Sequence, residues 1–260
     1  MKLLCPKCKK ILIKDQNSYK CINNHNYDIS KNGYLNLNLT NSKKISGDNK
    51  MMIDARISTL EKGYYNHLMN YLNTIIKDLN VKNCVDLACG SGYYTKNFTP
   101  LNKVGIDLSK AAINYACKKD KVTQYIIASI FDIPLQSDSY DLATLLFAPI
   151  PTTEIERILK INGYLITVTP AKNHLHELKA ILYDKPEQNT DNQIDTILKL
   201  VKSYNLEKEI CINSNTDLLN LFMMTPYYYK TSISDKKKLD KINSLNLTTS
   251  FIIKVYKKII

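Results

Sequence analysis

The sequence predicts an α/β fold, with a mostly parallel sheet covered by helices on both faces and a small extra domain at the N-terminus. Three observations indicate it. From Met51 onward, short apolar runs alternate with helical segments through short connections. Two glycines follow the first of these runs, where a strand would turn into a helix. Ahead of Met51, three cysteines and a histidine gather in a segment too short to build an apolar core of its own.

The expected elements of the main region follow in chain order. A helical segment spans Met51 to about Leu79 and is broken or kinked near Gly63, because glycine destabilises a helix interior. The run from Cys84 to Ala88 is short and apolar, as a buried strand would be. The other expected strands are 103–107, 124–128, 140–147, 164–169 and a closing strand at 248–256. The other expected helices begin at about 93, run from the cap Ser109 to about 119, and span about 153–161.

Composition limits the kind of protein. Of the 260 residues, 44% are hydrophobic and 23% charged, which is ordinary for a chain that buries a core. No run of about 18 apolar residues could cross a membrane, and no apolar leader precedes the chain's first cysteine. We therefore expect a cytoplasmic protein with no membrane partner. The formal charge of +12 favours a polyanionic partner, although a bias toward Lys, Asn, Ile and Tyr would produce the same excess.

Local composition divides the chain into three regions. Residues 1–36, the N-terminal module, are dense in Cys, Lys and Asn; residues 37–50 are polar and typical of a flexible linker; residues 51–260 carry the alternating elements. Seven cysteines without an export signal argue against a disulfide scaffold. We expect the four cysteines outside the module to be small buried hydrophobes: Cys84, Cys89, Cys117 and Cys211.

The N-terminal module has the ligand spacing of a structural zinc site. Cys5-x2-Cys8-x12-Cys21-x3-His25 supplies four soft or borderline ligands, as tetrahedral zinc requires. The alternatives are a redox dithiol and chance clustering, but a redox CxxC should begin a helix in a βαβ pattern. Four protein ligands close the site, so we expect no catalysis at this metal. The module is expected to present basic and aromatic residues to a nucleic acid: Lys7, Lys10, Lys14, Tyr19 and Lys20.

The glycine turn predicts a nucleoside-cofactor site. Asp86 lies in the first strand, Gly90 and Gly92 form the turn, and Asp107 ends the next strand, where a carboxylate can accept hydrogen bonds from ribose hydroxyls. A dinucleotide site would show a third glycine inside the helix, and none follows Gly92. The segment looks instead like the D-x-G-x-G-x-G signature of class I methyltransferases, with Ala88 in place of the first glycine. Ser129 falls where that class usually has an acid near the adenine.

Further segments narrow the resemblance. With the cysteine spacing and the glycine turn, the runs Gly33-Tyr34-Leu35-Asn36-Leu37, Phe147-Ala148-Pro149, His174-Leu175-His176-Glu177 and Met224-Thr225-Pro226-Tyr227 resemble the bacterial RlmA-type methyltransferases. The resemblance spans nearly the whole chain. It implies a Rossmann-like class I methyltransferase domain with a seven-stranded sheet, S-adenosylmethionine and Zn²⁺ as cofactors, and transfer of a methyl group to N1 of a guanine in a 23S rRNA hairpin. It also implies a possible homodimer, and cofactor contacts from Tyr65, Tyr94, Thr95 and His174.

The chemistry leaves several roles open. An exposed guanine could stack on aromatic rings, and the candidates are Phe147, Tyr227, Tyr228 and Tyr229. The sequence does not identify the catalytic base; His174, Glu177 and Asp132 are weak candidates. Two other functions stay open, a small-molecule methyltransferase and a non-catalytic RNA-binding protein with a vestigial cofactor fold.

Overall fold

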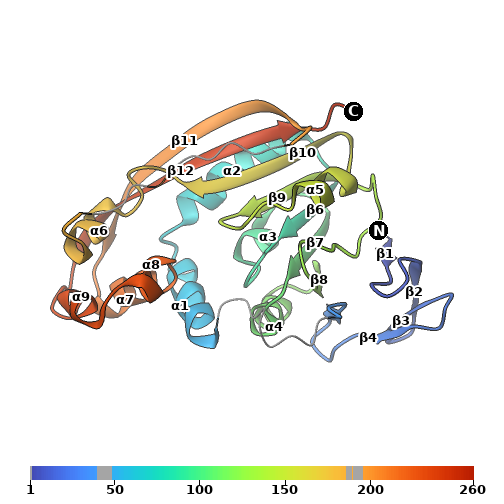
Figure 1. Cartoon of the computed structure of the whole chain (residues 1–260), viewed down its shortest axis with the longest axis horizontal. Helices are drawn as coiled ribbons and strands as arrows, with labels where there is room; N and C mark the ends of the chain where they lie inside the picture. Colours follow the sequence, from blue (N-terminus) through green and yellow to red (C-terminus); the bar gives the residue numbers. More distant parts are fainter. Residues whose placement is uncertain (1, 40–48, 186–188, 190–195) are drawn as a thin grey trace.

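The computed structural model describes residues 2–39, 49–185, 189 and 196–260 (Figure 1). Its N-terminal module contains a four-stranded antiparallel sheet in the order β1-β2-β3-β4. These strands are β1 (Leu3–Leu4), β2 (Ile11–Asp15), β3 (Ser18–Cys21) and β4 (Asn26–Asp28).

The main sheet has eight strands in the order β11-β12-β10-β9-β6-β7-β8-β5 within the described residues. From β10 to β5 every neighbouring pair is parallel, whereas β12 runs antiparallel to both β10 and β11. The predicted mostly parallel sheet is therefore confirmed. The strands are β5 (Leu35–Asn36), β6 (Asn83–Leu87), β7 (Asn102–Asp107), β8 (Gln124–Ile127), β9 (Tyr140–Leu146), β10 (Leu159–Pro170), β11 (Lys199–Ile212) and β12 (Leu245–Lys257).

Two strands differ from the expectation. The seventh strand of the main domain is β11, which residue patterns did not locate because it is an edge strand with exposed side chains along most of its length. Cys211 lies in this strand and is exposed, so its predicted burial was wrong. The eighth strand, β5, comes from the last two residues of the N-terminal module and pairs in parallel with β8.

The predicted helices are present and differ in their ends, whereas α6 to α9 were not predicted. The expected break near Gly63 separates α1 from α2, and Gly63 has φ +83°. The predicted helix at about 153–161 stops at Ile158, because Leu159 already pairs with β9 as the first residue of β10. The helices are α1 (Lys50–Glu61), α2 (Asn66–Leu79), α3 (Tyr93–Asn97), α4 (Lys110–Lys119), α5 (Thr152–Ile158), α6 (His176–Leu182), α7 (Asn215–Met223), α8 (Tyr227–Lys230) and α9 (Ile233–Lys236), followed by a short 3-10 turn (Lys237–Leu239).

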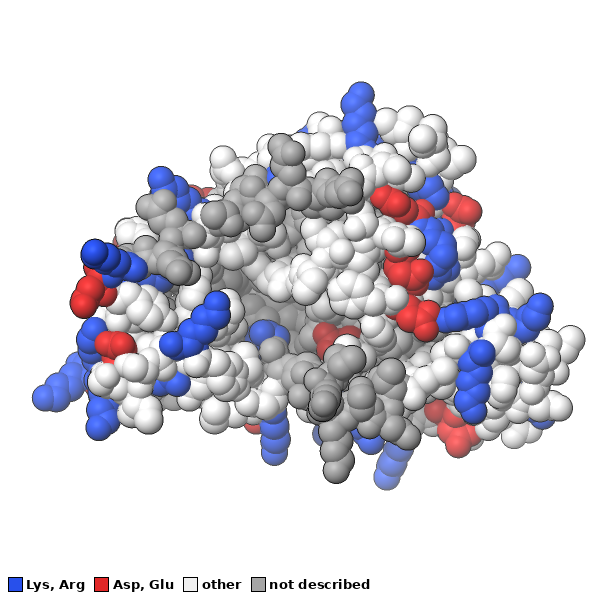
Figure 2. All heavy atoms as spheres, in the orientation of Figure 1, with Lys and Arg blue, Asp and Glu red and all other residues white. Residues whose placement is uncertain are grey.

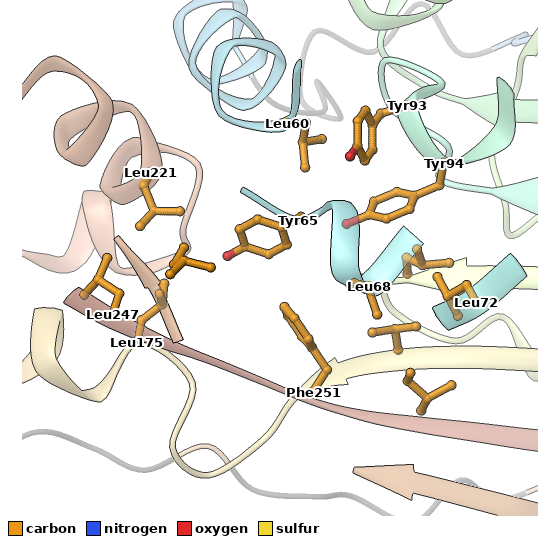
Figure 3. Packing of buried hydrophobic residues seen from close by; sticks show 14 of the residues in the cluster. Leu60, Tyr65, Leu68, Leu72, Tyr93, Tyr94, Leu175, Leu221, Leu247 and Phe251 are labelled. Atoms are coloured by element: carbon orange, nitrogen blue, oxygen red, sulfur yellow. The ribbon is translucent and has the colours of Figure 1, made fainter. Parts of the chain in front are cut away.

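One face of the sheet is covered by helices. Helix α2 buries Leu68, Leu72, Ile75 and Ile76, whose spacing places them on one side of the helix. They pack with residues of β9, β10 and β12 and with Tyr65 and Tyr94 (Figure 3). This apolar contact fixes α2 against the face of the sheet, and Leu60 of α1 and Tyr93 and Tyr94 of α3 join the same cluster.

The opposite face is covered by the N-terminal module, by the crossover from β8 to β9 and by helix α5, which buries Ile155 and Ile158 there. The chain crosses from β8 to β9 over this face through residues 128–139, which form no helix. Such parallel crossovers usually contain one. Here Leu3, Leu12 and Leu35 share one core cluster with strand residues such as Val85 and Ile106. The module is thus packed into the main domain, and most of the predicted linker, residues 40–48, lies outside the described residues.

None of the helices in the described ranges is both long and apolar enough to span a bilayer.

The turn after β6 gives a stability prediction. Gly92 has φ +72°, and a Cβ there would lie 2.5 Å from the Tyr125 hydroxyl, whereas a Cβ on Gly90, at φ +54°, would meet no atom within 4 Å. We expect Gly90→Ala to lower the free energy of unfolding by about 1–2 kcal/mol through backbone strain alone. Gly92→Ala should add a further loss of about 1–3 kcal/mol through overpacking. Urea unfolding measures both; equal losses would contradict the predicted clash.

Candidate cofactor cavity and metal site

A cavity of about 960 Å³ opens at the carboxyl ends of β6 to β10. In a parallel sheet this edge is where ligands bind, because the loops that leave the strands diverge there. Helix α1, the start of α2 and the segment between α7 and α8 complete the wall. Of the nine predicted cofactor residues, six line the cavity: Tyr65, Asp86, Tyr94, Asp107, Ser129 and His174.

The other three predicted residues lie behind the wall. Gly90 and Gly92 give the bend its left-handed backbone, and Gly92 precedes the first residue of α3. Thr95 is buried and donates its hydroxyl to Asp86 Oδ2 over 2.5 Å. Thr95 therefore orients the carboxylate of Asp86. The direct contact between Thr95 and the cofactor stays a prediction.

Asp107 ties the bend to the neighbouring strand. Its Oδ2 accepts the Gly90 N–H at 2.8 Å, and its Oδ1 accepts the Ser109 N–H at 2.7 Å. The carboxylate therefore holds two loops together at the cavity edge. Ala88, in the place of the first glycine of the signature, has φ +54°. This backbone conformation favours glycine, so alanine in this place raises the conformational free energy of the bend.

Asp86 is a buried carboxyl group with a perturbed pKa. It accepts hydrogen bonds from the Thr95 hydroxyl and, at 2.7 Å, from the Thr144 hydroxyl. Burial raises the pKa of Asp86 to about 6, and the two threonine hydroxyls act against that rise. A carboxyl group with such a pKa in a cavity wall is typical of a binding or catalytic site.

Two hydroxyl groups behave differently at this end of the cavity. Ser129 Oγ accepts the Phe131 N–H at 3.1 Å, so the serine folds onto its own loop. The Tyr94 hydroxyl is buried and has no hydrogen-bond partner within the described ranges. Figure 3 shows it directed toward Tyr65. An unsatisfied buried hydroxyl costs free energy, and a polar group of a bound ligand would satisfy it.

Of the three weak candidates for the catalytic base, only His174 lines the cavity. Glu177 accepts hydrogen bonds from the Thr248 N–H and hydroxyl, and Asp132 forms an ion pair with Lys9. Neither lines the cavity. His174 does, but its Nδ1 accepts the Ser250 N–H at 3.1 Å, so the proton of the neutral ring resides on Nε2, 3.5 Å from the Tyr65 hydroxyl. Burial lowers the pKa of His174 to about 3, which leaves it a neutral positioning group for Tyr65.

The far end of the cavity is aromatic. Phe147 follows β9, has φ +59° and is 45% exposed. The Tyr227 ring also lines the cavity; it lies under the Lys179 ammonium at 4.9 Å, and its hydroxyl donates to Asn189 Oδ1 at 3.0 Å. Of the four predicted stacking residues, Phe147 and Tyr227 line the cavity. Tyr228 instead packs edge-on against Phe222, and Tyr229 against Tyr228.

The four predicted metal ligands converge. Their ligand atoms all lie within 4.8 Å of one another. Cys8 Sγ and Cys21 Sγ are 3.7 Å apart, and His25 Nδ1 is 3.4 Å from both Cys5 Sγ and Cys21 Sγ. Tetrahedral zinc with bonds of about 2.3 Å to sulfur and about 2.0 Å to nitrogen places its ligands about 3.5–3.8 Å apart. The residues present therefore fit zinc.

Residue patterns missed a fifth group at the metal site. The Tyr27 hydroxyl lies 3.3 Å from Cys5 Sγ. Burial acts to raise the pKa of Cys5, but the Tyr27 hydroxyl and backbone N–H groups outweigh it and lower that pKa to about 6. A hydrogen-bond donor beside a thiolate ligand fixes the ligand and adjusts its charge.

The Tyr27 contact gives a prediction about the metal. We expect Tyr27→Phe to weaken zinc binding about tenfold or more, because outer hydrogen-bond partners of metal ligands typically contribute that much. Competition with a chromogenic chelator measures the affinity. Tyr19→Phe, in the neighbouring strand, is the matched control and should change it little; equal effects of the two variants would contradict the role of Tyr27.

His174 gives a prediction about pH. Its folded-state pKa of about 3 lies below its ordinary value of 6.5, so the unfolded chain binds the proton first as the pH falls. This stability is present above pH 6.5 and is lost below it, by about 2 kcal/mol between pH 7 and pH 5. His174→Gln should remove that part of the pH dependence in chemical denaturation. His176→Asn, at an exposed histidine, should leave the pH dependence as in the parent chain.

Comparisons with known proteins bear on both sites. Residues 3–45 match the zinc-ribbon model described as RlmA, N-terminal, and residues 80–244 match a model described as methyltransferase domain. The 23S rRNA (guanine(748)-N(1))-methyltransferase of Streptomyces fradiae is 31% identical over 185 residues, which cover 68% of this chain and 66% of the relative. YxjB of Bacillus subtilis (strain 168) is 30% identical over 181 residues, or 65% of this chain and 64% of that relative. The chain thus spans just under two thirds of the length of these relatives.

Solved structures agree on the fold. The YcgJ protein from Bacillus subtilis has a TM-score of 0.50 at 13% identity, and the match covers 74% of this chain and 98% of that one. The predicted class I methyltransferase fold is confirmed by the family match and this likeness. The predicted cofactors, S-adenosylmethionine and Zn²⁺, are confirmed by the two family models and the ligand cluster. The chain belongs to the methyltransferase family whose model it matches over residues 80–244, and it carries an RlmA-type N-terminal domain ahead of that region.

Proposed function

We propose that the protein transfers a methyl group from S-adenosylmethionine to N1 of a guanine in 23S rRNA. The observation that carries the proposal is a single cavity with two different ends. One end has the bend, Asp107 and Asp86, as a nucleoside cofactor requires, and the other is lined by the partly exposed ring of Phe147, which follows β9, and by Tyr227, the first residue of α8. The printed activity of the Streptomyces fradiae relative supports the choice of guanine N1.

The cofactor end offers groups suited to each part of S-adenosylmethionine. Asp107, at the end of β7, is placed to accept ribose hydroxyls. Asp86 offers a carboxylate for the positively charged part of the cofactor, and the Tyr94 hydroxyl offers the hydrogen bond it lacks within the protein. Ser129 and Ile130 would flank the adenine through backbone and apolar contacts. The bound cofactor supplies an electrophilic methyl group on a sulfonium centre.

The acceptor end would hold a base that has left its stack. Phe147 stays partly exposed in a left-handed backbone conformation, and such strain in a non-glycine residue is concentrated at functional sites. Tyr227 is fixed by Lys179 and Asn189 and so offers a ring that need not reorganise. Stacking on these rings would fix the plane of a purine, aligning its nitrogen with the methyl group and excluding water. None of the three base candidates is placed to accept the N1 proton, and we assign that role to none.

The N-terminal module would contribute to RNA binding. Four of its five predicted contact residues are exposed: Lys7, Lys10, Lys14 and Lys20; Tyr19 is half-buried against the shared core. Figure 2 shows lysine and arginine side chains spread around the margin of the face in view, with acidic side chains between some of them. Such a distribution suits a long polyanion that touches several sides of the site. The hairpin form of the substrate, the homodimer and the cytoplasmic location stay predictions.

One labelling experiment tests the proposal. Purified protein is incubated with tritiated S-adenosylmethionine and either deproteinised rRNA or a metabolite pool, and the labelled product is digested and mapped. Label on guanine N1 is expected. Label confined to metabolites would favour a small-molecule methyltransferase, and cofactor binding without transfer would favour a non-catalytic RNA-binding protein.

A variant pair tests the cofactor end by calorimetry. Asp107→Asn should weaken cofactor binding about tenfold or more, because an amide cannot accept at both ends and charge-assisted hydrogen bonds are worth about 1.5–3 kcal/mol. Asp78→Asn, an exposed carboxylate on α2, should leave the affinity unchanged. Equal affinities for Asp107→Asn and the parent chain would exclude Asp107 from the site.

A further inference from the structure

The crossover from β8 to β9 is held by the N-terminal module at one end and forms the cofactor wall at the other. Ser129, Ile130 and Phe131 line the cavity, and the next residues contact the module. We propose that the zinc-bound module positions this wall, so that zinc occupancy and cofactor affinity are coupled. The inference rests on the proposed function for the identity of the cofactor, and it assigns Leu3 and Lys9 as positioning residues.

Strand β1 pairs directly with the crossover. Leu4 N–H donates to the Pro134 carbonyl at 2.9 Å, and the Gln136 N–H donates to the Lys2 carbonyl at 3.3 Å. Leu3 forms an antiparallel bridge with Leu135, and both side chains are 2% exposed or less. Because the crossover has no helix of its own, these contacts supply backbone partners and apolar cover that it would otherwise lack.

The metal ligands fix the residues that make these contacts. Cys5 follows β1 immediately, and its backbone exchanges hydrogen bonds of 2.8 Å with Lys9 and Lys10 across the Cys5–Cys8 turn. This turn gives Lys9 a left-handed backbone (φ +58°) and aims its ammonium at Asp132, with which it forms an ion pair. Cys5 and Cys21 are themselves buried in the cluster that contains Leu3 and Leu135. Without zinc, the four ligand side chains are no longer bonded to one metal ion. The pairing of β1 with the crossover and the Lys9–Asp132 ion pair then lose the structure that fixes them.

Helix α5 also binds the crossover, so loss of zinc should lower cofactor affinity only in part. Arg157 donates to the Leu135 carbonyl at 2.7 Å and to the Ile133 carbonyl at 2.8 Å, and Glu154 accepts the Ile133 N–H at 2.6 Å. Helix α5 therefore holds the middle of the crossover independently of the metal. Loss of zinc should loosen the wall and lower cofactor affinity without abolishing it.

The test compares the full chain with zinc and after stripping by a chelator. Titration with S-adenosylhomocysteine in a calorimeter should show binding weakened about tenfold in the stripped chain, within the range usual for coupled sites. By linkage, saturating S-adenosylhomocysteine should raise zinc affinity by the same factor. Hydrogen exchange should become faster at residues 130–136 and stay unchanged at 252–255 in β12, which lies across the sheet.

Zinc-loaded variants separate positioning from folding. Leu3→Ala should weaken S-adenosylhomocysteine binding about threefold to tenfold, as expected for a coupled site. Lys9→Gln should weaken it by no more than about threefold, because exposed ion pairs contribute little. Ile13→Ala, at a 69% exposed side chain of the same module, is the matched control and should have no effect.

Each outcome decides the matter. Equal affinity and equal exchange in loaded and stripped chains would overturn the coupling. If circular dichroism shows that the stripped chain unfolds, zinc-loaded Leu3→Ala decides, and parent-like affinity in that variant would overturn it. Failure of the loaded parent chain to bind S-adenosylhomocysteine would instead count against the proposed function, and the exchange at 130–136 would still test whether zinc orders the wall.

Discussion

The carboxylate of Asp107 bridging Gly90 and Ser109 is the interaction on which the cavity depends. It joins the bend after β6 to the start of α4, so the two loops cannot separate without breaking charge-assisted hydrogen bonds. The bend itself stores strain, because Ala88, which is not a glycine, adopts a left-handed backbone. Asp86, in the strand that leads into the bend, is buried and accepts hydrogen bonds from two threonine hydroxyls. Strain and unsatisfied polarity are thus concentrated where a charged nucleoside would bind.

The electrostatics of the cavity follow from burial. The same desolvation raises the pKa of Asp86 and lowers that of His174, since it disfavours whichever form is charged. Near neutral pH the wall therefore combines a carboxylate that a cation would stabilise with an imidazole that stays neutral. This combination suits a positively charged cofactor, because a protonated histidine beside it would repel it. His174 contributes by fixing the hydroxyl of Tyr65.

The N-terminal module is a structural part of the main domain as well as a metal site. Its apolar residues cover the second face of the sheet together with the crossover and α5, and β5 extends the sheet beside β8. A small module of this size cannot bury enough surface to fold alone; here it shares a core with the main domain and holds its own metal site. The same packing leaves four lysines of the module exposed, which are the residues that we propose for RNA binding.

The sequence by itself determined the elements whose causes are local. The ligand spacing of Cys5, Cys8, Cys21 and His25, the break at Gly63, and the order of the bend and Asp107 follow from near-neighbour chemistry. Contacts between distant segments were decided only by tertiary structure. Residue patterns did not place β11, since its side chains are mostly exposed, and could not show that Asp132 pairs with Lys9 or that Glu177 serves Thr248. The pairing partner of a side chain depends on how the whole chain packs, and no local pattern encodes it.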